Sequence, residues 1–271
     1  MPAFSPTLSP RSDTLVLRIA KSEILMVLPY GERITSAESA TFTRKSGMSA
    51  TANLREAFKK CDLLQQSFSG IQVLADVPTM LVPEDEFQEA DSQVLFDHVY
   101  KGYEYHLKAH TPLTALHSVA VYAIEKDIMT VIGDHCSRYQ ILPFSVPVWC
   151  YLHRHEQSQN RRKLFAYFHD THLDVFSFSR NRFAFANSFK VENEHDALYY
   201  ILYTWSQMKL DNEKDELHMI GDVLNRRWLS ERIKQYLRRP FFDSIEPLSC
   251  KMTPTCLPMP ADVQALTDMA Y

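Results

Sequence analysis

The segment His169-Asp170-Thr171-His172 gathers two imidazoles, a carboxylate and a hydroxyl within four residues. Imidazole and carboxylate ligands together suit zinc or manganese. The same composition is typical of a solvated turn, and two histidines on a hairpin need not share a face. We therefore expect exposed or locally hydrogen-bonded histidines here rather than a metal site. His153 and His155 lie two apart on an expected helix and would point about 200° from one another, which disfavours joint ligation.

No nucleophile stands out, because neither a G-x-S-x-G elbow nor a G-x-x-x-x-G-K-[ST] loop occurs. The five cysteines are odd in number, widely spread and free of any C-x-x-C, which indicates neither a disulfide framework nor a zinc site. They are Cys61, Cys136, Cys150, Cys250 and Cys256. With no apolar run of membrane-spanning length, these signals predict a soluble protein of the reduced cytoplasm that does not bind membranes.

Residues Leu224–Arg239 form a basic amphipathic segment with six Lys or Arg residues and a single acidic residue, Glu231. A basic helix with aromatic residues can contact RNA or other phosphates. More often such a helix is a solvated face beside acidic neighbours, here the run Asp211–Glu216. We therefore do not expect nucleic acid as the partner.

Aromatic residues make up 12% of the chain, and most of them must be buried. On an expected strand over Arg182–Val191, Phe183 and Phe185 alternate, so one face could stay exposed. An exposed apolar patch of that kind would indicate a protein partner.

The elements that position these residues follow the same order twice. Runs of alternating or continuous apolar residues predict strands, and spacings of three and four predict helices. In the first half, strands are expected at Thr14–Ala20, Glu23–Pro29, within Arg33–Arg44, and at Ile71–Ala75, His117–Ile124 and Gln140–Leu142; helices at Ser49–Ser67, Asp91–Tyr105 and Lys126–Cys136; and a connecting helix to His155.

In the second half, strands are expected at Leu164–His169, Leu173–Phe178, Arg182–Val191, Leu217–Ile220 and Ser244–Leu248, and helices at Glu192–Met208, Val223–Arg239 and within Asp262–Met269. The order strand, strand, strand, helix, strand, helix, strand thus recurs with an offset of about 150 residues. This order predicts an α/β fold of mixed α+β character, with a five-stranded mixed sheet and flanking helices in each of two lobes.

Three segments carry a resemblance to a known family: LADVPTMLVPEDEF at Leu74–Phe87, KLFAYFHDTHLDVFSF at Lys163–Phe178 and FANSFKVENEHDALYYIL at Phe185–Leu202. They resemble an uncharacterised bacterial family with the actin-like ATPase, ribonuclease H-like fold of the actin, hexokinase and heat-shock chaperone superfamily. The resemblance spans roughly Thr14–Leu248. It implies a duplicated fold and no particular reaction.

The superfamily holds ATP with two Asp-x-Gly hairpins around the phosphates and Mg²⁺, and with a glycine pair near the adenosine. The first hairpin here, Arg18–Glu23, has neither Asp nor Gly. The second keeps Asp170 and Thr171 without a glycine, and the late strand keeps only Gly221 of the pair. Asp170, Thr171 and Gly221 are therefore the candidate contacts of a vestigial nucleotide cleft, with no catalytic residue and no metal ligand assigned.

Composition agrees with this degenerate site. The chain has 6 glycines in 271 residues, where ordinary usage of about 7% would give roughly 19. Its net charge of −4 gives no general attraction to nucleic acid or anionic membranes.

We expect a disordered N-terminus at 1–12, a first lobe with its connecting helix at 13–155, a linker at 156–163, a second lobe at 164–249 and a Pro-containing tail at 250–271. The predicted function is a non-catalytic, cytoplasmic binding or assembly module without a bound cofactor, which binds a protein partner or a second copy of itself. The alternatives are a divergent ATP-binding protein or ATPase that uses an interlobe cleft with Mg²⁺, and a nucleic-acid adaptor that uses helix 224–239.

Overall fold

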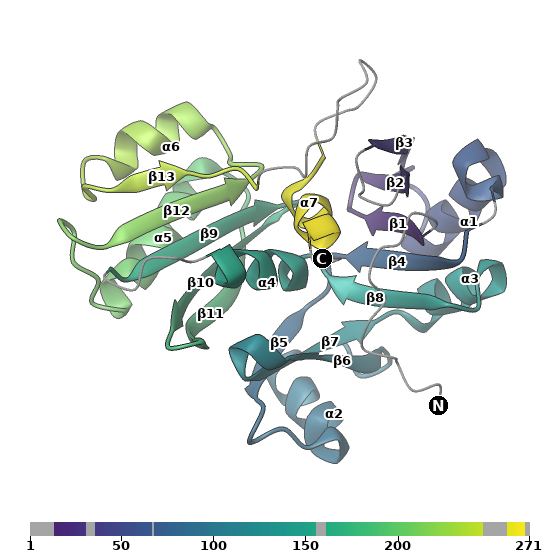
Figure 1. The fold of residues 1–271 in the computed structure, drawn as a ribbon, viewed down its shortest axis with the longest axis horizontal. Helices are drawn as coiled ribbons and strands as arrows, with labels where there is room; N and C mark the ends of the chain where they lie inside the picture. The colour runs from purple at the N-terminus through teal and green to yellow at the C-terminus, as the bar shows by residue number, and fades with distance from the viewer. Residues whose placement is uncertain (1–13, 31–35, 67, 156–160, 246–258, 269–271) are drawn as a thin grey trace. The chain divides into compact units, whose positions relative to one another are not determined.

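The computed structural model describes residues 14–30, 36–66, 68–155, 161–245 and 259–268. The chain divides into two compact units, one with the residues up to Val148 and those from Glu246 onward, the other with Trp149–Ile245 (Figure 1). Of the predicted N-terminus, linker and tail, residues 1–12, 156–160, 250–258 and 269–271 lie outside the described part of the chain. The predicted domain limits stay a prediction.

The first unit is built on a mixed sheet with the strand order β3-β2-β1-β4-β8. Its strands are β1 (Thr14–Ile19), β2 (Glu23–Tyr30), β3 (Ser36–Thr43), β4 (Gly70–Ala75) and β8 (Tyr139–Pro143). Alternate residues of β1, namely Leu15, Leu17 and Ile19, join a buried apolar core with α1 (Ala50–Lys60) and α3 (Lys126–His135). The hairpin, the helices and the parallel strands expected from the apolar pattern are confirmed.

A smaller antiparallel sheet, ordered β5-β7-β6, interrupts this plan between β4 and α3. It consists of β5 (Thr79–Pro83), β6 (Leu107–Leu113) and β7 (Ser118–Ile124), with α2 (Glu89–Val99) packed against it. The Tyr122 hydroxyl of β7 donates to the Ile141 carbonyl of β8 at 2.8 Å and so ties this sheet to the first one. The sequence did not predict β6, because LKAHTPL contains a proline and no regular alternation.

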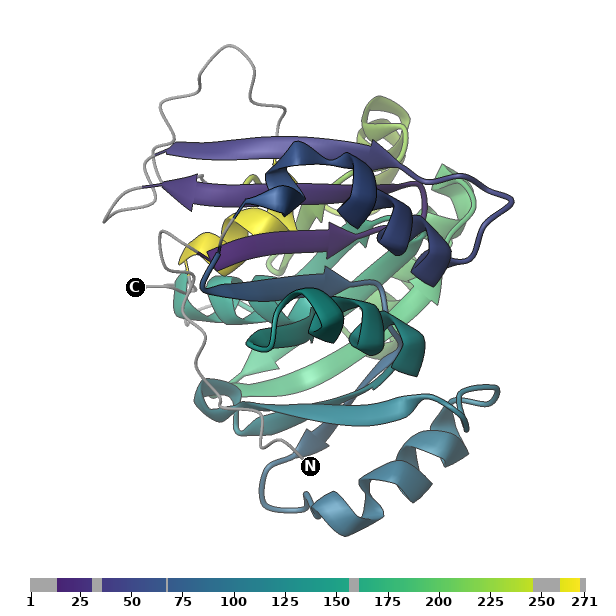
Figure 2. The ribbon, with the colours of Figure 1, turned by 90° about the vertical axis from the view of Figure 1, so that its right-hand side faces the viewer.

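The C-terminal helix α7 (Ala261–Asp268) belongs to the first unit. Figure 2 shows α1 and α3 on one face of the first sheet and α7, in yellow, on the other. Val263, Ala265 and Leu266 of α7 are fully buried or nearly so. The chain therefore returns to the first unit after the second one and covers the sheet face that its core helices leave open.

The second unit repeats the same sheet order as β11-β10-β9-β12-β13. Its elements are β9 (Lys163–His169), β10 (His172–Ser179), β11 (Arg182–Lys190), α5 (Glu194–Gln207), β12 (Glu216–Gly221), α6 (Arg226–Ile233) and β13 (Pro240–Phe242). Leu164, Ala166 and Phe168 of β9 face a core shared with α5 and α6. The two five-stranded mixed sheets confirm the predicted fold class.

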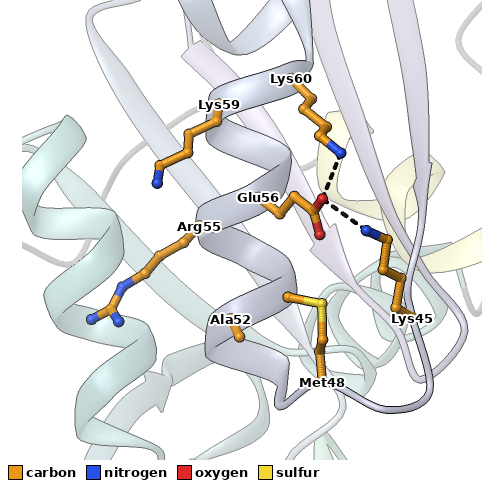
Figure 3. A pocket seen from close by; sticks show the side chains of 7 residues that line it. All are labelled: Lys45, Met48, Ala52, Arg55, Glu56, Lys59 and Lys60. Atoms are coloured by element: carbon orange, nitrogen blue, oxygen red, sulfur yellow. Dashed lines mark hydrogen bonds and ion pairs between the residues drawn. The ribbon is translucent and has the colours of Figure 1, made fainter.

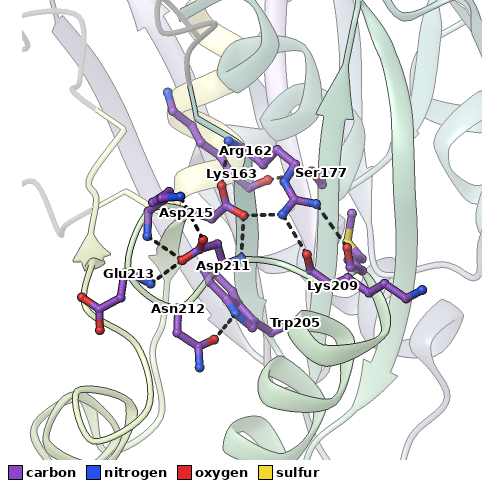
Figure 4. A network of polar contacts seen from close by, with 11 residues as sticks. Arg162, Lys163, Ser177, Trp205, Lys209, Asp211, Asn212, Glu213 and Asp215 are labelled. Atoms are coloured by element: carbon purple, nitrogen blue, oxygen red, sulfur yellow. Dashed lines mark hydrogen bonds and ion pairs between the residues drawn. The ribbon is translucent and has the colours of Figure 1, made fainter.

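A polar network fixes the carboxyl end of α5 to the start of β9 (Figure 4). The Arg162 guanidinium donates to the Lys209 carbonyl at 2.8 Å and pairs with the Asp215 carboxylate at 2.7 Å. Asp215 is 6% exposed and also accepts from the Asp211 amide. Since carbonyls at a helix end lack intrahelical partners, the arginine satisfies them and positions the turn into β12.

The limits of four predicted elements were wrong in detail. The last strand is β13 at Pro240–Phe242 and not Ser244–Leu248, of which residues 246–248 lie outside the described part. The helix expected over Val223–Arg239 is α6, and it ends at Ile233. The helices expected over Ser49–Ser67 and Asp91–Tyr105 are α1 and α2, and they end earlier, at Lys60 and Val99. The connecting helix expected to end at His155 is α4 (Ser145–His155), as predicted. None of the helices described has the length and apolar character needed to cross a membrane.

Candidate functional site

The candidate residues Asp170, Thr171 and Gly221 lie at one edge of the second sheet. Strands β9 and β12 are parallel, with Gly221 in register with Phe168, so both strands end at the same edge. Asp170 and Thr171 form the turn that follows β9, and Asp170 has a left-handed φ of 48°. The fold therefore places the three predicted residues at the same edge of the second sheet.

Gly221 is required at this edge for a steric reason. Its φ is 85°, and a Cβ built on it would lie 2.2 Å from the Phe168 carbonyl oxygen. The next amide, of Asp222, donates to that same carbonyl at 3.1 Å. The absence of a side chain at Gly221 lets the Phe168 backbone, at the end of β9, lie close to it. Backbone packing alone therefore explains this glycine.

Three polar side chains share the face of the hairpin opposite the core. His172 lies directly opposite His169 in the register of β9 and β10, and their ring centroids are 6.0 Å apart. The His169 Nε2 atom lies 2.9 Å from the Asp174 Oδ2 atom, and these side chains are only 4% and 6% exposed. The two histidines therefore do share a face, which their turn-like sequence did not indicate, and His169 is engaged by Asp174.

The first hairpin, in the other unit, has its own cation in place of a phosphate loop. Arg18 is 5% exposed, and its Nε atom lies 3.0 and 2.8 Å from the two carboxylate oxygens of Asp262 on α7. The Arg18 guanidinium also lies 4.1 Å from the centre of the Phe144 ring. A buried charge is stable only when it is paired, and Asp262 supplies that pairing.

The turn of the first hairpin is occupied by protein groups. The Ala20 amide donates to the Glu23 carbonyl at 3.0 Å, and the Arg44 guanidinium donates to the Ala20 carbonyl at 2.6 Å. The Arg44 amide donates to the Ser22 carbonyl at 2.8 Å. A phosphate cradle presents free amides from a glycine-rich turn, and this turn presents lysine and serine side chains instead.

Other candidates in the described residues show no reactive geometry. Burial raises the pKa of the Cys150 thiol to about 11, so it stays protonated near neutral pH and is a poor nucleophile. His153 approaches Asn181 at 3.3 Å and His155 the Tyr151 carbonyl at 2.9 Å, so the two rings have different partners. No cluster of three or more His, Cys, Asp or Glu side chains suited to a metal occurs among the residues described. Cys250 and Cys256 lie outside them.

The basic segment around α6 has partners within its own unit. Arg227 pairs with Glu231 at 3.2 Å, while Arg226 lies over the Phe242 ring and Arg232 over the Trp228 ring. Arg238 approaches Glu213 of the acidic run at 4.0 Å. These contacts are those of a solvated face beside acidic neighbours.

Sequence reasoning missed Asp262, Asp174 and Arg44. Asp262 lies 244 residues from Arg18, and no local pattern could indicate that pairing. For Asp174, its place two residues after His172 on a predicted strand was a usable signal, because alternate residues share a face. Arg44 was expected only as the end of a strand.

Comparisons with known proteins agree with the observed fold. Residues 8–239 match the family model described as Protein of unknown function (DUF3822). A crystal structure from Bacteroides thetaiotaomicron VPI-5482, of a protein with actin-like ATPase fold and unknown function, matches with a TM-score of 0.82 and 23% identity over 96% of each chain. A chain of the PilM-PilN type IV pilus biogenesis complex matches with a TM-score of 0.59 and 12% identity, over 96% of this chain and 98% of that one. No curated protein matches the sequence.

Proposed function

The chain belongs to the DUF3822 family and has the actin-like ATPase fold, and we propose that it is a non-catalytic binding and assembly module. The observation that carries the proposal is the buried pair between Arg18 and Asp262 at the first hairpin. An actin-like ATPase would need an acidic residue and a glycine there to hold Mg²⁺ and phosphate. This chain has a cation that is already neutralised by its own C-terminal helix.

The second hairpin supports the same proposal. Gly221 is needed for contact with the Phe168 backbone, and His169 is paired with Asp174. A complex of protein chains, PilM-PilN, contains a chain of similar fold, and this supports a role in binding another protein. We place this role in the cytoplasm, because the five cysteines are odd in number and spread without a disulfide pattern.

A second candidate function is divergent nucleotide binding, because Asp170, Thr171 and Gly221 do lie at one edge of the second sheet. The test is Mg²⁺-dependent ATP hydrolysis by the purified full chain. We expect phosphate release at the background rate, unchanged in Asp170→Ala. ATP turnover that requires Mg²⁺ and disappears in Asp170→Ala would overturn the proposed function and favour an ATPase.

A further inference from the structure

A basic groove runs along α1 in the first unit (Figure 3). It is open, has a volume of about 480 Å³, and has Met48 and Ala52 among its apolar lining. We call this the α1 groove. Its charged lining consists of Lys45, Arg55, Glu56, Lys59 and Lys60.

The charge of the α1 groove is only partly compensated. Lys45 and Lys60 both bind the Glu56 carboxylate, at 2.8 and 2.5 Å. Within the described part of the chain, the exposed side chains of Arg55 and Lys59 have neither an ion pair nor a hydrogen bond. Figure 3 shows these two side chains extending from the helix on the side away from Lys60 and Lys45. The groove thus combines an apolar lining with free positive charge and fits an acidic, partly apolar helix.

The same unit exposes a helix of that description. On α2, Val94, Leu95 and Val99 are 72%, 45% and 59% exposed, although a helix in a folded domain normally buries such residues. The helix contributes Phe96 to the core of the small sheet, so its other apolar face is left outside. Its first turn carries the exposed carboxylates Glu89 and Asp91. We call this the α2 surface.

The α2 surface was not the exposed apolar surface expected from the sequence. Phe183 of β11 packs against Trp149 and Phe178, and Phe185 packs against the second core. Neither is among the large apolar side chains that the structure leaves exposed. In the first unit, the exposed apolar side chains that cluster on one helix are those of α2, namely Val94, Leu95 and Val99.

We propose that the α2 surface of one molecule docks into the α1 groove of a second copy of this chain. Both views show α1 and α2 at opposite ends of the first unit, with the sheets between them (Figures 1 and 2), so they cannot meet within one molecule. Each surface complements the other and not itself, since one is cationic and the other anionic. The contact is therefore head-to-tail and continues beyond a dimer.

The basic surface around α6 is a poorer docking site for the α2 surface than the α1 groove. Arg226, Arg227 and Arg232 around α6 already contact an aromatic ring or a carboxylate. Arg55 and Lys59 have no such contact among the described residues and can gain one without losing another. Charge complementarity of this kind also makes the association weaker at high salt.

The proposal rests on the proposed function, because it names the partner of that binding module. It is tested by sedimentation velocity of the full chain over a concentration series at low and high salt. We expect the average mass to rise past that of a dimer as concentration increases, and high salt to reduce it. A wild-type chain that stays monomeric would contradict the proposal and leave the ATP test untouched, so the two failures are distinguishable.

Two variants break opposite sides of the contact. Arg55→Glu with Lys59→Glu reverses the charge of the groove, and Val94→Ser with Val99→Ser removes apolar area from α2. All four positions are exposed, so the melting temperature should stay close to that of the wild type. Each variant alone should associate at least about tenfold more weakly, equivalent to about 1.4 kcal/mol.

Mixing the two variants gives the sharpest outcome. The intact α2 surface of the groove variant can fill the intact groove of the α2 variant, so the mixture should form a complex that stops at two chains. Arg227→Glu with Lys234→Glu makes the same charge change on α6 and the residue directly after it, and this variant should associate as the wild type does. The proposed contact would be overturned if this control lost as much self-association as the groove variant, or if the mixture stayed monomeric. If the groove variant does not fold, persistent association of the α2 variant would overturn it.

Discussion

Gly221 illustrates what a single residue contributes at the edge of the second sheet. Its left-handed φ and the Phe168 carbonyl beside it explain the glycine without a ligand. The resemblance singled out this residue as a candidate nucleotide contact, but the steric role seen here depends on a strand-to-strand distance that composition does not contain. The same holds for His169 and His172, whose shared face follows from a turn register that the residue types alone left open.

Gly221→Ala should destabilise the second unit by about 2 kcal/mol or more, because alanine meets both an unfavourable φ and a backbone oxygen. Gly47→Ala is the control, since a Cβ there meets nothing within 4 Å. Urea unfolding measures the change in unfolding free energy for both variants. An effect of Gly221→Ala within about 0.5 kcal/mol of zero would contradict the steric account.

The Glu56 carboxylate makes the folding stability depend on pH in the acidic range. Hydrogen bonds from Lys45 and Lys60 lower the pKa of Glu56 from 4.5 to about 2. A depressed folded-state pKa stabilises the fold above the unfolded pKa, and that contribution is lost as pH falls toward the folded value. The stability difference between wild type and Glu56→Gln should therefore be constant above about pH 4.5 and shrink toward pH 2. A difference that does not change with pH would contradict this interpretation.

At the scale of elements, the apolar pattern predicted those that carry continuous or regularly spaced apolar residues. The β1–β2 and β9–β10 hairpins, α3 and α5 all lie within a few residues of their predicted limits, whereas α1 begins as predicted and ends seven residues early, at Lys60. β6 was missed because it is half-buried and contains Pro112. Helix α6 ends before the basic pattern does, since the residues after Ile233 turn toward β13. Amphipathic spacing identified α2, but it could not tell which of its faces the small sheet covers.

The packing of helix α7 should depend on the buried ion pair between Asp262 and Arg18. Asp262→Ala leaves Arg18 charged and buried, which should cost about 3 kcal/mol or more in the unfolding free energy of the first unit. Replacing both partners, as Arg18→Met with Asp262→Leu, should recover most of that loss. A double-mutant cycle, with unfolding free energies measured in urea, gives the coupling energy between Arg18 and Asp262. Additive effects of the two changes would show that α7 does not need this pair.

At the scale of the whole molecule, the recurring order of strands and helices predicted two sheets of the same topology, and the structure confirms them. The order was readable because each sheet is assembled mostly from neighbours in the chain. The return of the C-terminal helix to the first unit was not readable, because its contact with Arg18 spans 244 residues. In the proposed function, the same long-range contact neutralises the cation at the first hairpin.

The central claim is that this fold lacks its ATP cradle, and the melting temperature of the full chain with and without millimolar Mg²⁺-ATP tests it most directly. Selective binding at about 100 times the dissociation constant would add about 2.7 kcal/mol of stability and raise the melting temperature by several degrees. We predict no change beyond that produced by Mg²⁺ with an equal concentration of phosphate. A rise of several degrees with Mg²⁺-ATP alone, abolished in Asp170→Ala, would contradict the account.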